Sequence, residues 1–93
     1  DENVVAFNDL NPITPVHVLV VPKNHYDNII DGIPAATLES VTKAIAAVVE
    51  KTGIKETGFR VVTNTGKHGG QSVNQVHFHI LGGKQLNDSM GGK

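Results

Sequence analysis

Two histidines near the C-terminus, His77 and His79, are separated by one residue in the segment QVHFHILGG. Alternate side chains of a strand point to the same face, so the two imidazoles would share a face, with their Cα atoms about 7 Å apart. Gln75 would lie on that face too. The intervening residues are apolar and can bury on the other face: Val76, Phe78 and Ile80. The pattern therefore predicts a strand with one core face and one chemical face.

Paired histidines suit phosphorus chemistry at neutral pH. A neutral ring nitrogen can attack phosphorus, and a neighbouring imidazole can transfer a proton. A metal site is an alternative, because histidines at i and i+2 of a strand can chelate, with a third ligand from His17, His25 or His68. Histidines merely tolerated on a solvent face are another. The chain has no cysteine, and no acidic cluster lies near the pair, which favours the phosphorus chemistry.

A glycine-rich loop, NTGKHGGQS, directly precedes this strand. Gly66, Gly69 and Gly70 permit tight turns, and consecutive free N–H groups there could bind phosphate oxygens, with the Ser72 hydroxyl as a further donor. Such loops are common before strands, so the loop alone is weak evidence. Joined to the paired histidines, it indicates a phosphate site.

The remaining elements follow from hydrophobic periodicity. Strand-like runs are expected at 4–7, from Val16 to Pro22, at 59–63 and at 73–81. A helix is expected from Pro34 to Thr52, with Pro34 in its first turn and Gly53 at its end. Its apolar stripe steps by three, four and three residues: Leu38, Val41, Ile45 and Val48. Residues 25–31 are expected to form one or two helical turns, and the tail 87–93 to be loose.

These elements predict one α+β domain over residues 1–93, with a single helix on one face of the sheet. The short final connection favours antiparallel pairing there. With eight basic and nine acidic residues, the chain has no net positive field that would attract nucleic acid or an anionic membrane. No apolar run approaches the ~20 residues of a membrane span, and the lack of cysteine favours a reducing, cytoplasmic location. The missing initiator Met suggests a trimmed or incomplete chain.

The segment GGQSVNQVHFHILGG resembles the signature of the histidine-triad (HIT) superfamily, and most resembles its nucleotide-binding (Hint) branch. AFNDLNPITPVHVLVVPKNH and VVTNTGKHGGQSV are also similar to that branch, so the resemblance covers nearly all of residues 4–86. It implies an antiparallel meander sheet with one long helix packed on one face, lacking the family's usual N-terminal segment. It also implies a homodimer.

The resemblance further implies a hydrolase that cleaves purine nucleoside phosphoramidates at the α-phosphate. His77 matches the nucleophile that forms a nucleotidyl-histidine, His79 the histidine that contacts the phosphate or leaving group, and His17 a supporting histidine. The matched phosphate contacts are Asn64, Gly70 and Ser72, and the matched wall for base and ribose is Phe7, Asp9 and Leu10. A nucleotide-binding module with little turnover and a dinucleoside polyphosphate hydrolase are the alternatives.

Several matched residues have simpler explanations. Phe7 and Leu10 would be core residues in many folds, and Asp9 could serve only the turn that follows it. His25 could cap a following helix, and His68 is expected to be exposed.

The sequence also departs from the family. Gln75 replaces the first histidine of the triad, although the glutamine of the uridylyltransferase branch occupies the last position, so a transferase is not indicated. The tail lacks a tryptophan found in some relatives. The two N-terminal cysteines that bind zinc in some members are absent, so we expect no metal and no cofactor.

Overall fold

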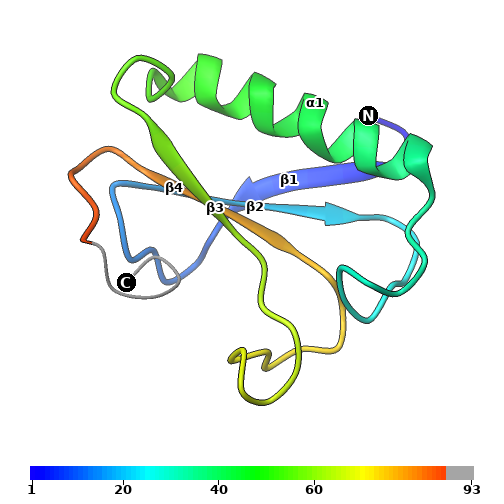
Figure 1. Cartoon of the computed structure of the whole chain (residues 1–93). Coiled ribbons are helices and arrows are strands. Elements are labelled where there is room, and N and C mark those ends of the chain that lie inside the picture. The colour runs from blue at the N-terminus through cyan, green and yellow to red at the C-terminus, as the bar shows by residue number, and fades with distance from the viewer. Residues whose placement is uncertain (88–93) are drawn as a thin grey trace.

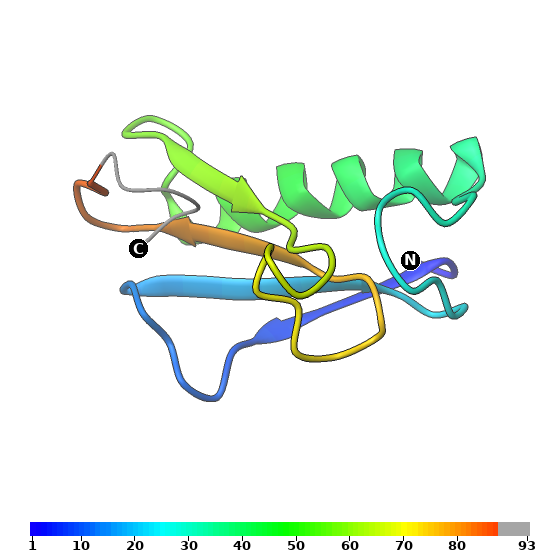
Figure 2. The same ribbon diagram turned by 60° about the horizontal axis from the view of Figure 1, so that its bottom comes forward.

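The computed structural model describes residues 1–87 and forms a four-stranded sheet with one helix. In chain order the elements are β1 (Val4–Asn8), β2 (Val16–Pro22), α1 (Ala35–Thr52), β3 (Phe59–Val62) and β4 (Phe78–Gly82). The helix lies along one side of the sheet (Figure 1; Figure 2). The expected α+β class is confirmed. No helix within residues 1–87 has the length and apolar character to cross a membrane.

The sheet order is β1-β2-β4-β3, and every neighbouring pair is antiparallel. β4 therefore lies between β2 and β3, with hydrogen-bonded partners on both sides. Its residue His79 is opposite Leu19 on β2 and Val62 on β3, and Leu19 is in turn opposite Phe7 on β1. These four side chains form one row on the face of the sheet opposite α1, which we call the open face.

The core lies between the sheet and α1. Its buried side chains come from β1, β2, β4 and α1 and from the loops beside them: Val4, Val18, Val20, Val41, Val49, Ile54, Val76, Phe78 and Ile80. The most enclosed of them, such as Ile80, each contribute roughly 1.5–3 kcal/mol by leaving water. Because these residues alternate with those of the open face along β2 and β4, the core fixes the direction of the histidine side chains.

The helix differs in detail from the expected one. Pro34 precedes the first helical residue, and its carbonyl accepts the N–H groups of Thr37 and Leu38. Gly53 ends the helix in the left-handed conformation, φ 75°. Ile45 and Val48 pack partly buried against the chain's own core. Val41 is buried, so only part of the apolar stripe of the helix stays accessible, and Leu38 is 37% exposed.

Residues 25–31 contain bends and a turn but no helical turn, contrary to expectation. The N–H group of Asp27 is bonded by the Asp31 carboxylate at 2.8 Å, and that of Ile30 by the Asn28 side chain at 3.0 Å. Side chains that bond nearby N–H groups in this way compete with helical hydrogen bonding.

The last strand begins at Phe78, five residues later than expected. β3 ends at Val62, so the segment before Phe78 has no ladder partner on that side. It is bonded instead to the loop after β2, where the Val76 N–H donates to the Tyr26 carbonyl at 2.6 Å. The expected loose tail falls mostly on residues 88–93, outside the described residues.

Candidate active site

Three histidines converge on the open face. His17 comes from β2, His79 from β4, and His77 from the residue directly before β4. The ring centroids of His17 and His79 are 5.1 Å apart, and those of His77 and His79 are 5.0 Å apart. His17 is buried, whereas the other two are half-buried and reachable from outside. The expected pairing of His77 and His79 on one face holds, although His77 is not in the strand.

The hydrogen bond of His77 fixes its tautomer. Its Nδ1 lies 2.8 Å from the main-chain carbonyl of Gln75. A carbonyl can only accept, so Nδ1 carries a proton, and in the neutral ring Nε2 then keeps its lone pair. Nε2 has no hydrogen-bond partner among residues 1–87. His77 therefore presents an unprotonated ring nitrogen, the form that a nucleophile requires.

The tautomer of His17 is set by a hydrogen-bond donor, whereas that of His77 is set by an acceptor. The backbone N–H of Ile13 lies 3.2 Å from His17 Nδ1 and can only donate, so Nδ1 accepts and Nε2 carries the proton. Nε2 lies 2.8 Å from His79 Nδ1, which must then accept. His79 consequently carries its proton on Nε2. These hydrogen bonds leave the Nε2–H of His79 as a donor beside the Nε2 lone pair of His77.

The environment of His79 favours its neutral form. Burial lowers the pKa of His79 below its ordinary value, the positive charge that His77 or His17 would carry when protonated lowers it further, and Asp9 opposes the shift. A neutral His79 is compatible with the single proton assigned to each ring. The cluster is thus arranged for one lone pair and one N–H directed at a ligand.

Asp9 serves both the turn and the histidine cluster. Its Oδ1 accepts the Asn11 N–H at 2.7 Å, the turn role expected of it. Its Oδ2 lies 3.5 Å from His17 Nε2. The carboxylate is thus beside the histidines; its predicted contact with ribose hydroxyls stays a prediction.

Phe7 and Leu10 are not core residues. They are 49% and 94% exposed, so the simpler explanation given for them is wrong. Phe7 stands two strands from His79 in the row of the open face, a separation of about 10 Å by the strand spacing. Its predicted contact with a base stays a prediction.

The glycine-rich loop is closed by its own hydrogen bonds. The Asn64 side chain donates to the Gly69 carbonyl at 2.7 Å, and the Gly70 N–H donates to the Lys67 carbonyl at 3.1 Å. The Gly70 N–H was expected to be free, but it is already bonded. A phosphate would have to replace this bond. The Ser72 hydroxyl and N–H have no partner within the described chain and are exposed.

Close packing of the loop explains one of its glycines. A Cβ at Gly69 would lie 2.3 Å from the Thr65 carbonyl oxygen, which is too close for any side chain. His68 is exposed, as expected. His25 caps no helix; it pairs with Asp27 at 2.7 Å and both are exposed.

The site uses two groups that sequence reasoning missed. One is the Ile13 backbone N–H that orients His17. A main-chain group carries no signal in the residue type. The other is Gln71, whose side chain bonds within the loop and across to residue 27. Its place between the glycine pair and Ser72 marks it only as a polar loop residue.

The structure brings Asp9, His17 and His79 together as potential metal ligands, with one ligand atom of each within 4.8 Å of the others. Neither His25 nor His68 belongs to this group. A metal-bound histidine almost always donates its other N–H to an acceptor. At His17 the other nitrogen faces the Ile13 N–H, a donor, so a metal on Nε2 would force two N–H groups together. The donor set therefore fits a hydrogen-bond chain better than a metal.

A cavity of about 860 Å³ lies between the end of α1 and the start of β3, and none of the five histidines lines it. The histidine cluster is instead an open site on the sheet, next to the glycine-rich loop. The fold and this site define a class of protein: a small α+β protein with a histidine cluster suited to phosphorus chemistry.

Comparison with known proteins agrees with that class. The HIT domain family matches residues 1–86, and the chain belongs to this family. An uncharacterized HIT-like protein of Rickettsia prowazekii is 39% identical over 92% of this chain and 74% of its own length. The purine nucleoside phosphoramidase of Escherichia coli K12 is 37% identical over the same shares.

Solved structures agree as well. A histidine triad protein from Clostridium difficile has a TM-score of 0.86 and 47% identity, covering 95% of this chain and 78% of that one. A HIT family hydrolase from Legionella pneumophila has a TM-score of 0.91 and 34% identity, covering 98% and 83%. These relatives support a hydrolase in general.

Proposed function

We propose that the protein hydrolyses purine nucleoside phosphoramidates at the α-phosphate through a nucleotidyl-histidine intermediate. The observation that carries the proposal is the fixed tautomer of His77, with Nδ1 on the Gln75 carbonyl at 2.8 Å and an unprotonated Nε2. The phosphoramidase of Escherichia coli, at 37% identity, supports the choice of substrate class.

In the first step, His77 Nε2 attacks the α-phosphorus and the P–N bond breaks, so the amine leaves with its electron pair and takes up a proton from the water that reaches this open site. Attack places positive charge on the His77 ring. The Gln75 carbonyl, which accepts from Nδ1, stabilises that charge. In the second step, water attacks the phosphorus and loses a proton to the solvent, which releases the nucleotide and restores His77 with its Nε2 lone pair.

His79 and the loop would hold the phosphate. The Nε2–H of His79 and the unpaired donors of Ser72 can both bond phosphoryl oxygens whose charge increases in the transition state. Because its lowered pKa favours the neutral form, His79 would act as a hydrogen-bond donor to the phosphate or leaving group without adding a full charge. The Phe7 side chain, two strands away and half exposed, would contact the base.

A conjugate of AMP with tryptamine or lysine tests the proposal. A catalyst releases AMP over many turnovers, and His77→Ala provides the matched control. Release of no more than one AMP per protein would contradict the proposal and favour a nucleotide-binding module. Cleavage of adenylated polyphosphates in preference to the conjugate would favour a dinucleoside polyphosphate hydrolase.

We also propose a homodimer. β3 is an edge strand, and its side chains Phe59 and Val61 are each 41% exposed on the side of the sheet next to α1. Exposed apolar edge strands pair readily with another chain, and a second copy would cover both the edge and these side chains. The proposed partner surface is therefore centred on β3.

A further inference from the structure

The side chain of Gln71 bonds three main-chain groups at once. Its Oε1 accepts the Gly66 N–H at 2.9 Å, and its Nε2 donates to the carbonyls of Asp27 at 2.6 Å and Val73 at 2.9 Å. A primary amide has two N–H donors, and both are used here. Gln71 is half-buried, although most of the loop around it is exposed.

The first of these bonds closes the glycine-rich loop on itself. The Gln71 backbone N–H also donates to the Gly66 carbonyl at 3.0 Å, so residues 66 and 71 are joined by a side-chain bond and a main-chain bond. The bond to Val73 spans Ser72. Gln71 thereby fixes the chain on both sides of the residue that offers unpaired donors.

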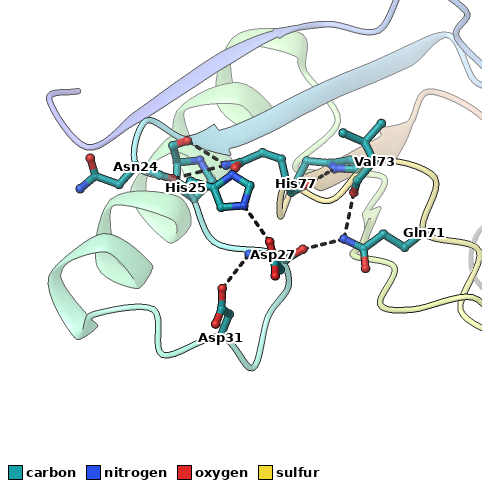
Figure 3. A network of polar contacts seen from close by, with 9 residues as sticks. Asn24, His25, Asp27, Asp31, Gln71, Val73 and His77 are labelled. Atoms are coloured by element: carbon teal, nitrogen blue, oxygen red, sulfur yellow. Dashed lines mark hydrogen bonds and ion pairs between the residues drawn. The ribbon is translucent and has the colours of Figure 1, made fainter.

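The bond to Asp27 ties the loop to the segment after β2. Figure 3 shows Asp27 between His25 and Gln71, with Asp31 beside it. The Asp27 N–H is held by the Asp31 carboxylate, and its side chain is paired with His25 at 2.7 Å. The segment is therefore held by its own contacts and can serve as an anchor for Gln71.

Other bonds connect the same two segments. The Gln75 side chain reaches the carbonyls of Pro22 at 3.3 Å and Asn24 at 3.4 Å, and the Val76 N–H bonds Tyr26. The first two are long, whereas the Gln71–Asp27 bond is short. Of these side-chain bonds, only the Gln71–Asp27 bond comes from a residue of the glycine-rich loop.

We propose that Gln71 is a positioning residue that sets the shape of the glycine-rich loop and thereby its affinity for the phosphate of the nucleotide. The inference rests on the proposed function for the identity of the ligand. Gln71 acts through Ser72 and the loop amides, because its own amide is occupied by main-chain groups. Its contribution is thus specific to the phosphate and does not extend to the nucleoside.

Two variants separate the bond that closes the loop at Gly66 from the bonds to Asp27 and Val73. Gln71→Met keeps the length of the side chain and removes all three bonds. Gln71→Glu keeps an acceptor for the Gly66 N–H but loses the donor that ties the loop to Asp27 and Val73. Gln85→Met is the matched control, because Gln85 is exposed and its side chain bonds only the adjacent Leu86 carbonyl.

Calorimetry with AMP and with adenosine measures the phosphate-specific effect. Both Gln71 variants should bind AMP at least tenfold more weakly than wild type, while adenosine affinity changes by less than twofold. With the phosphoramidate substrate, KM should rise by a similar factor and kcat should stay within threefold. The Gln85→Met variant should match wild type in every measurement.

Amide hydrogen exchange without ligand measures the loop itself. The Gly66 N–H should exchange at least tenfold faster in Gln71→Met but remain protected in Gln71→Glu. Unchanged exchange in Gln71→Met, unchanged AMP affinity, or an equal loss of AMP and adenosine affinity would each overturn the inference. If wild type binds neither ligand, the proposed function fails together with the phosphate part, and the exchange experiment still decides whether Gln71 shapes the loop.

Discussion

Gln75 occupies the first position of the histidine triad, and restoring histidine there tests how the site works. The group that fixes His77 is the main-chain carbonyl of residue 75, at 2.8 Å from Nδ1. A change of side chain leaves this carbonyl in place. We therefore expect Gln75→His to leave His77, the proposed nucleophile, in the same tautomer and to change turnover by less than about tenfold, under roughly 1.4 kcal/mol of barrier.

The contacts of the Gln75 side chain also predict how much it contributes to stability. Its Nε2 lies 3.3 Å from the Pro22 carbonyl and 3.4 Å from the Asn24 carbonyl, both long for hydrogen bonds. Together they contribute no more than about 1 kcal/mol to stability. Removing them in Gln75→Ala should therefore lower the free energy of unfolding by about that amount, equivalent to a fall in Tm of roughly 4–8 °C for a domain of this size.

Steady-state release of AMP from a phosphoramidate, with thermal unfolding measured in parallel, checks both numbers. Gln85→His controls for the added imidazole at an exposed position. A gain in turnover of a hundredfold or more in Gln75→His would refute the reasoning. It would show that the first position transfers a proton, which an amide cannot do, and would favour a binding module in the natural protein.

Four further outcomes are expected. His77→Ala should abolish turnover while AMP affinity, measured by calorimetry, stays within about tenfold, or roughly 1.4 kcal/mol; activity near wild type would contradict its role. Light scattering at micromolar concentration should give about twice the 9.9 kDa of one chain, and Val61→Asp should reduce it to the monomer; a wild-type monomer would refute the dimer. Because the pKa of His79 is lowered in the folded state, the unfolded state binds more protons just below pH 6.5, so stability should fall as pH drops through that region; denaturant unfolding of His79→Gln should show a smaller fall. Gly69→Ala should weaken AMP binding and speed hydrogen exchange in the loop, since its Cβ would meet the Thr65 carbonyl at 2.3 Å, and unchanged values would contradict the observed packing.

The sequence by itself determined those features that depend on neighbours along the chain. Alternation in β2 and β4 correctly separated the core face from the face of His77 and His79, because successive side chains of an extended chain must point in opposite directions. The end of α1 at Gly53 was predictable for a similar reason, since glycine readily takes the left-handed conformation there.

Tertiary structure decided the contacts between distant segments. His17 meets His79 across 62 residues only because β4 pairs with β2, and sequence periodicity does not specify which strands pair. The last strand begins at Phe78 and not at 73 because β3 stops at Val62, a limit set by its partner and not by its own residues. The tautomers of His77 and His17 depend on main-chain groups of residues 75 and 13, whose identity as donor or acceptor is the same for almost every residue type. Only their position in space gives them a role, and that position is fixed by the packed sheet.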